Sequence, residues 1–90
     1  MPRSIRIVHI TSDFEKSFKK LPINIQTLAQ TKDQLFRKNA FHPQLHTHRL
    51  KGKLKEYWSY AINRKYRILF RFLKSDEVIY YDIGTHEIYR

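Results

Sequence analysis

The chain has 90 residues, a length that fits one domain, and we expect a single domain over residues 1–90. It carries 18 Lys and Arg against 8 Asp and Glu, a formal net charge of +10, which favours a polyanion or an acidic protein as partner. The absence of cysteine excludes a disulfide framework and thiol chemistry. No apolar stretch reaches the length of a membrane span, so we expect a cytoplasmic protein without membrane contact.

The N-terminal half predicts one strand followed by two helices. The run IRIVHI, residues 5–10, is β-rich and short, which is typical of a strand. Ser12 and Glu15 have the spacing of a capping box at the start of a helix. Apolar residues then recur at helical spacing up to Pro22: Phe14, Phe18 and Leu21. A second helical stripe, with Lys32 as its one polar gap, predicts a longer helix: Ile25, Leu28, Ala29, Leu35 and Phe36.

The C-terminal half predicts a sheet. Residues 39–56 lack a clean period and contain Pro43 and Gly52, so we expect mostly loop with a short strand near the end. Aromatic and β-branched runs then predict three antiparallel strands within residues 56–62, 66–73 and 78–83, with Asn63 starting the first turn. We therefore expect an α+β fold with an N-terminal strand, two helices that pack on a small antiparallel sheet, and a short C-terminal segment.

Side-chain alternation assigns the two faces of the middle strand. Ile68, Phe70 and Phe72 share one face, which we expect to join Trp58 and Tyr60 in the core. Leu69 and Leu73 share the other face with two cations, Arg67 and Arg71. A guanidinium binds a carboxylate or a phosphate through two parallel hydrogen bonds. The arginines therefore either pair with Asp82 or hold a phosphate. Tyr57 and Tyr89 are the better candidates for exposed aromatic residues.

Positive charge concentrates in one stretch. Between Gln34 and Ser75 the chain has eleven Lys or Arg and a single acid, Glu56. Lys51, Lys53 and Lys55 alternate, so in an extended segment they would form a basic row on one side. Such a row suits a phosphate backbone; the alternative is a lysine-rich sheet edge that prevents aggregation.

Five histidines suggest two kinds of chemistry. His42, His46 and His48 lie close in sequence, but without cysteine or a nearby carboxylate they form only part of a zinc site, so we expect no metal and no cofactor. Cleaving RNA without a metal requires a base for the 2′-hydroxyl proton, an acid for the departing 5′ oxygen and positive charge at the phosphate. His48, His86 and Arg67 are the candidates for these roles.

The pattern from HRLKGKLKEYWSYAI through KYRILF to YYDIGTHEIY resembles the RelE/ParE superfamily of type II toxin-antitoxin toxins, most specifically from Leu50 to Tyr89. The resemblance implies a compact α+β fold and an acidic antitoxin that binds the toxin in a heterocomplex. In most branches it also implies cleavage of mRNA in the ribosomal A site. One branch, the ParE-type toxins, inhibits DNA gyrase and has no nuclease activity.

The resemblance also implies roles for single residues. Arg67 matches the sheet arginine that RelE-like toxins use on the scissile phosphate. His86 and His48 match catalytic histidines of YafQ-like toxins, and Tyr89 lies near the C-terminal tyrosine of RelE-like ones. Lys51 and Lys53 lie where RelE-like toxins place catalytic or rRNA-binding lysines, and His48 and Lys53 are the candidates for the general base.

The match has one gap, because Ala61 and Lys65 stand where YafQ-like enzymes carry a further histidine and an aspartate. RNA or ribosome binding is expected of five other cations: Arg49, Lys51, Lys55, Lys65 and Arg71. The sequence thus predicts a metal-independent, ribosome-dependent mRNA endoribonuclease that acts on ribosome-bound mRNA. The alternatives are a gyrase-inhibiting toxin and a basic module that only binds RNA or an acidic protein.

Overall fold

The computed structural model describes residues 3–89, with side chains up to residue 88. It confirms the predicted α+β fold, with the N-terminal strand beginning at Ile7 rather than at Ile5. Three short 3₁₀ turns, η1 to η3, accompany the helices and strands. The elements follow in chain order: β1 (Ile7–Ile10), α1 (Ser12–Lys20), α2 (Ile23–Lys38), η1 (Pro43–Leu45), β2 (His48–Arg49), η2 (Gly52–Leu54), β3 (Trp58–Ala61), β4 (Arg67–Lys74), β5 (Glu77–Gly84) and η3 (His86–Tyr89).

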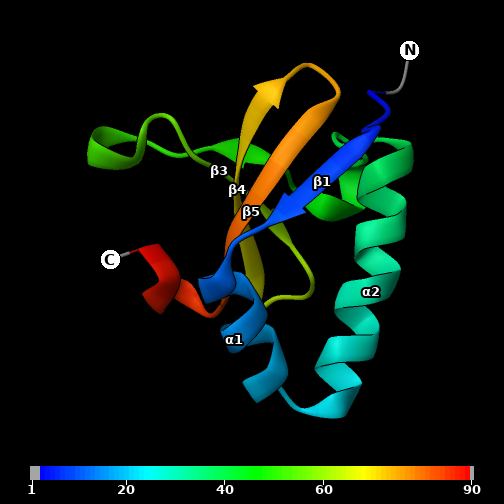
Figure 1. Ribbon diagram of the computed structural model, residues 1–90, viewed down its shortest axis with the longest axis vertical. Helices are drawn as coiled ribbons and strands as arrows, with labels where there is room; N and C mark the ends of the chain where they lie inside the picture. The colour runs from blue at the N-terminus through cyan, green and yellow to red at the C-terminus, as the bar shows by residue number, and fades with distance from the viewer. Residues whose placement is uncertain (1–2, 90) are drawn as a thin grey trace.

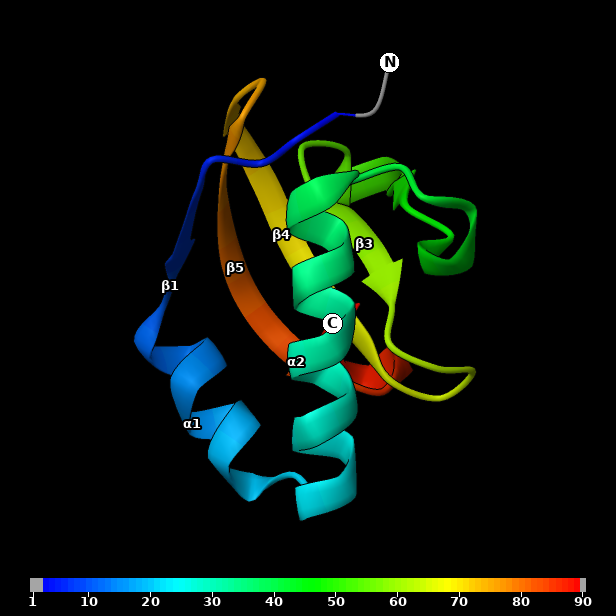
Figure 2. The ribbon, with the colours of Figure 1, turned by 90° about the vertical axis from the view of Figure 1, so that its right-hand side faces the viewer.

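The five strands form one sheet in the order β1-β5-β4-β3-β2. Strands β3 to β5 are antiparallel, as predicted, and the short β2 joins them antiparallel to β3. Strand β1 lies parallel to β5, with Ile7 opposite Glu77 and Ile10 opposite Tyr80. The two helices carry the chain from the β1 edge to the β2 edge along one side of the sheet (Figures 1 and 2). The opposite side, which the helices leave uncovered, is called the open face below.

Local side-chain hydrogen bonds define where the first helix and a later turn begin. Thr11, rather than Ser12, caps α1: its Oγ1 accepts from the Phe14 N–H at 3.0 Å and donates to the Tyr81 carbonyl at 2.8 Å. The predicted capping box was therefore one residue too late. Asn63 forms the predicted turn between β3 and β4, because its Oδ1 accepts from the backbone N–H of two following residues, Lys65 and Tyr66.

The core lies between α2 and the sheet (Figure 2). Phe36 of α2 is fully buried and stacks on Tyr60 with ring centroids 4.5 Å apart, while Phe70 meets the Phe36 ring at 5.0 Å. Trp58 and Phe72 pack against this cluster, so the predicted core residues of β3 and β4 are confirmed.

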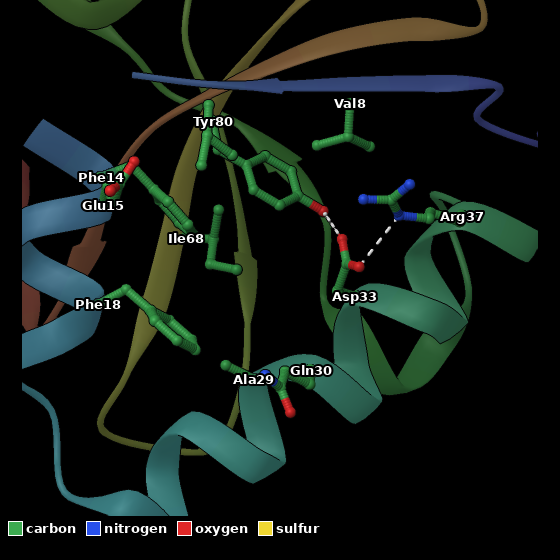
Figure 3. A pocket seen from close by; sticks show the side chains of 11 residues that line it. Val8, Phe14, Glu15, Phe18, Ala29, Gln30, Asp33, Arg37, Ile68 and Tyr80 are labelled. Atoms are coloured by element: carbon green, nitrogen blue, oxygen red, sulfur yellow. Dashed lines mark hydrogen bonds and ion pairs between the residues drawn. The ribbon is translucent and has the colours of Figure 1, made fainter. Parts of the chain in front are cut away.

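A hydrogen-bonded chain of side chains leads from this core to a cleft of about 240 Å³ between α1, α2 and β1 (Figure 3). The Tyr60 and Tyr80 hydroxyls lie 3.0 Å apart, and the Tyr80 hydroxyl donates to Asp33 Oδ1 at 2.7 Å. Arg37 Nε donates to the second oxygen of Asp33 at 3.0 Å. Burial raises the pKa of both tyrosines, so their hydroxyls stay protonated in the folded chain.

These raised pKa values predict a loss of stability in alkali. Above pH about 10, tyrosines of the unfolded chain ionise while Tyr60 and Tyr80 remain protonated, so the unfolded state is favoured as the pH rises. We expect Tyr60→Phe to be less stable at pH 8, by about 1 kcal/mol for the lost hydrogen bond, but to lose less than the wild type between pH 9 and 11. Urea unfolding at these pH values measures both effects. Tyr66→Phe, outside the network, is the control, and an equal alkaline loss in Tyr60→Phe and wild type would contradict the explanation.

Candidate functional site

Strand β4 presents two half-buried arginines on the open face. Ile68 and Phe70 are buried under the helices, and Arg67 and Arg71 alternate with them, as predicted. In Figure 1, α2 lies on one side of the sheet, whereas the loop that contains η2 and the C-terminal η3 project on the other side. The arginines therefore lie on the side from which η2 and η3 project.

Strand pairing places His48 on the same face as these arginines. His48 pairs with Ser59 of β3, and Ser59 pairs with Leu69 of β4. Because paired residues point to the same face of a sheet, His48 belongs to a row that includes Leu69, two residues from Arg67. The separation between β2 and β4 is two strand spacings, about 10 Å, which an arginine side chain and a bound phosphate can bridge.

His48 and Arg67 also line one hollow of about 830 Å³, called the basic hollow below. Strand β2 has only two residues, so the edge of β3 beyond Ser59 is not paired and the hollow forms there, beside α2. Within the part of the chain that the structure describes, the remaining lining includes two cations and no carboxylate: Leu28, Lys32, Gln44, His46, Ala61, Ile62, Asn63 and Arg64. Two of the predicted catalytic residues are thus brought together in a positively charged site.

Three residues that line the basic hollow were not among the predicted site residues: Lys32, His46 and Arg64. The sequence does distinguish Lys32, because it is the one polar residue in the apolar stripe of the longer helix. A lysine at such a position lies at the border of the buried face, and here it is half-buried and lines the basic hollow. Ala61, which stands where YafQ-like enzymes have a histidine, lines the same hollow.

A hydrogen bond fixes the tautomer of neutral His48. Its Nδ1 lies 2.9 Å from the carbonyl oxygen of His46, and because a carbonyl only accepts, Nδ1 carries the proton. The carbonyl is directed by the backbone of His46, which has a φ of 50° at the end of η1. Nε2 is then the nitrogen with the lone pair, so neutral His48 is able to take a proton from a bound hydroxyl.

The arginines of the open face hold no carboxylate in the part of the chain that the structure describes. The alternative in which they pair with Asp82 is wrong, because Asp82 Oδ1 instead accepts from the backbone N–H of Ile83 at 2.8 Å. Arg71 places its guanidinium 5.8 Å from the centre of the Tyr57 ring. The other role predicted for Arg67, binding of a phosphate, fits its position in the basic hollow.

The predicted basic row of lysines is wrong in its geometry. Lys51, Lys53 and Lys55 are exposed, but η2 replaces the extended segment, because Gly52 has a φ of +69° and the Lys55 N–H bonds back to the Gly52 carbonyl. Three lysines on a turn do not share one side. Lys53 does not line the basic hollow, so of the two candidates for the base only His48 does.

The other two predicted RNA-binding cations are exposed at separate places. Arg49 donates from Nε to the Lys55 carbonyl at 2.6 Å, which attaches β2 to the loop that contains η2. Lys65 lies in the turn between β3 and β4, with its Nζ 5.8 Å from the centre of the Tyr66 ring.

His86 begins η3, close to the start of β4 but outside the basic hollow. Gly84 is the strand partner of Arg67, so His86 follows that partner by two residues. Gly84 has no positive φ, so backbone freedom is not the reason for a glycine at this position. A Cβ at Gly84 would instead lie 2.8 Å from Cγ2 of Ile88, so glycine allows η3 to pack closely on β5. The side chain of Tyr89 lies outside the described residues.

Gly84→Ala is therefore expected to displace η3, and His86 with it, while the sheet stays folded. If His86 is catalytic, as the resemblance implies, the predicted mRNA cleavage should slow on the order of 10-fold or more, because a displacement of about 1 Å strongly impairs catalysis. The midpoint of thermal unfolding should change little. Removing the opposing methyl in Gly84→Ala/Ile88→Ala should restore part of the activity. If the double variant is no better than the single one, the close contact is not the reason for glycine here.

Within the described residues, no group of three or more His, Cys, Asp or Glu side chains could hold a metal ion. His42 Nδ1 accepts a hydrogen bond from the Gln44 N–H at 3.1 Å and so caps η1.

Neither the length nor the apolar content of any helix within residues 3–89 is sufficient for a membrane span.

Comparisons with known proteins agree with one another. A family model described as the RelE-like toxin of the type II toxin-antitoxin system HigB matches residues 6–86. A copper-bound mutant toxin from Helicobacter pylori is 28% identical, with a TM-score of 0.68 over 90% of this chain and 94% of that one. Two more distant structures share the fold. The toxin-antitoxin complex RelBE2 from Mycobacterium tuberculosis is 16% identical, with a TM-score of 0.75 over 92% of this chain and 93% of that one. YafQ from E. coli is 14% identical, with a TM-score of 0.67 over 91% and 94%. A search of curated proteins finds no match.

Proposed function

We propose that this chain, which belongs to the HigB-like family of RelE-like toxins of type II toxin-antitoxin systems, cleaves mRNA on the ribosome. The observation that carries the proposal is the basic hollow, where a histidine able to accept a proton and an arginine without a carboxylate partner among the described residues line one concave surface. Inhibition of gyrase would require neither group, so the nuclease accounts for more of the site.

The reaction starts with the 2′-hydroxyl of the nucleotide before the cleaved bond. Nε2 of His48 takes the hydroxyl proton, and the 2′ oxygen attacks the phosphorus while the bond to the 5′ oxygen breaks. Arg67 binds the non-bridging oxygens and stabilises the negative charge that grows on them. His86 donates a proton to the departing oxygen, so the products are a 2′,3′-cyclic phosphate and a 5′-hydroxyl. These three side chains account for both proton transfers and the charge without a metal ion.

The partners follow from the charge. The exposed cations of the turns, Lys51, Lys55 and Lys65, lie outside the basic hollow and would contact rRNA or the mRNA backbone. Binding to programmed ribosomes should therefore weaken steeply with salt, because each neutralised phosphate releases counterions. A type II toxin has an antitoxin, and we propose an acidic one that neutralises this surface in a heterocomplex.

Induction of the chain without antitoxin, followed by primer extension on cellular mRNAs, tests the proposal. We expect cuts inside translated reading frames and none in an mRNA whose start codon has been removed, because the substrate is mRNA on the ribosome. Intact mRNA together with loss of gyrase supercoiling would reject the nuclease in favour of a gyrase inhibitor. Equal cutting of the untranslated mRNA would reject ribosome dependence alone.

A further inference from the structure

We infer that the open face carries a stacking platform for an unpaired RNA base, formed by Tyr57, Tyr81 and the guanidinium of Arg71. The inference rests on the proposed function and names where a nucleotide near the cleaved bond would lie. These three residues, called the aromatic platform below, are separate from the lining of the basic hollow.

The geometry is that of a small aromatic and cationic surface. The Tyr57 and Tyr81 rings meet edge to face, with centroids 5.2 Å apart and planes at 74°, and Arg71 lies 5.8 Å from the Tyr57 centroid. All three side chains are half-buried, and none belongs to the hydrophobic core or to the residues packed against it. Rings held on one side and accessible on the other are the surfaces on which bases of single-stranded RNA stack.

Tyr81 lies on this surface at a β-bulge. The pairing of β4 with β5 shifts between Leu69 and Phe70, which leaves Tyr81 as an extra residue on β5. Tyr80 is buried in the core, so strand alternation turns Tyr81 to the open face, and the bulge lets the next residue, Asp82, lie on that face as well, opposite Leu69. A bulge interrupts the ladder and re-aims side chains, and bulges are common beside functional sites.

Charge and position favour RNA as the occupant. Arg71 follows Arg67 by four residues on the same face of β4, about 13 Å along the strand. A strand of RNA whose phosphate binds Arg67 would place a neighbouring nucleotide over the aromatic platform. The acidic side chains of a peptide could bind the arginines, but Asp and Glu have no aromatic ring to stack on the tyrosines. Because every base has a stacking face, we expect the platform to accept all four bases.

The test uses the full chain without ribosomes and a six-residue 2′-O-methyl oligonucleotide that contains one 2-aminopurine and cannot be cleaved. Binding should quench the 2-aminopurine fluorescence, because the base stacks on the platform. Tyr57→Ala and Tyr81→Ala should each weaken binding by about 5- to 100-fold and reduce the quenching. Tyr57→Phe and Tyr81→Phe should keep both, because the ring and not the hydroxyl makes the contact.

Two further variants separate stacking from charge and from general damage. Arg71→Gln should make the plot of log affinity against log salt concentration less steep by about one, whereas Tyr57→Ala should leave this slope unchanged. Phe41→Ala is the matched control. The Phe41 ring is exposed and also lies near a guanidinium, that of Arg3, 5.2 Å from the ring centre. It contacts Trp58 and Phe72, however, and therefore lies on the helix side of the sheet. Thermal unfolding confirms that each variant is folded.

Any of three results would overturn the platform. These are a wild type that does not bind the oligonucleotide, alanine variants that bind it as well as the wild type does, and a hexaglutamate peptide whose binding is weakened equally by Tyr57→Ala. Quenching by a chain that leaves ribosome-bound mRNA intact would support the platform and reject the proposed nuclease, so the two failures are distinguishable.

Discussion

Arg67→Ala is expected to lower the single-turnover rate of mRNA cleavage on programmed ribosomes by about 10²–10³-fold, the usual effect of removing one group that stabilises transition-state charge. Arg67 is half-buried at the start of β4 and pairs with no carboxylate among the described residues. Its removal therefore leaves no buried charge without a partner, and the thermal midpoint should change little. Arg67→Lys should recover only part of the rate, because an ammonium group cannot bind two phosphate oxygens in the planar geometry of a guanidinium.

Arg64→Ala is the matched control for Arg67→Ala. Arg64 is an exposed cation of the turn between β3 and β4 and lines the same basic hollow. Loss of this charge should weaken ribosome binding and leave the rate at saturation almost unchanged. If Arg64→Ala and Arg67→Ala reduce the saturated rate equally, the hollow acts through its overall charge and Arg67 has no special place at the phosphate.

His48→Ala is expected to reduce the same rate by about 10²–10⁴-fold, the range for a general base. His46→Asn is a close control, because His46 lines the same hollow but acts on His48 through its backbone carbonyl, and asparagine tolerates the left-handed φ of 50° that directs this carbonyl. Full activity of His48→Ala would assign the base elsewhere, with Lys53 as the next candidate.

The roles of His48 and His86 are separable by changing the leaving group. An mRNA with a bridging 5′ sulfur at the cleaved bond departs as a thiolate, which needs no acid. His86→Ala should then approach the wild-type rate, whereas His48→Ala should stay slow, because the 2′-hydroxyl still requires a base. If the sulfur substrate rescues neither variant, His86 is not the acid.

The strands could be predicted because their signals are local. The alternation along β4 separated buried Ile68 and Phe70 from Arg67 and Arg71, and a single side chain, that of Asn63, makes the following turn. The parallel pairing of β1 could not be predicted this way, since its partner β5 lies some seventy residues later and no local pattern specifies which edge a first strand joins.

The site was predicted less completely, because its members come together through the fold. The pairing of His48 with β3 placed it on the same face as Arg67, two strands away, and no spacing in the sequence specifies that arrangement. Alternating lysines looked extended, but the left-handed backbone of Gly52 makes a turn instead. Asp82 looked like an ion-pair partner, but its carboxylate accepts from the next backbone N–H, and among the described residues it forms no ion pair with Arg67 or Arg71.

The most direct test of the central claim is cleavage of an mRNA on purified ribosomes with a single 2′-deoxy nucleotide at the mapped cut. Attack by the 2′-hydroxyl predicts that the unmodified mRNA is cut to a 2′,3′-cyclic phosphate and a 5′-hydroxyl, and that the deoxy mRNA stays whole at that position. Cutting of the deoxy mRNA at the same bond, or products with a 5′-phosphate and a 3′-hydroxyl, would contradict a mechanism built on His48, Arg67 and His86.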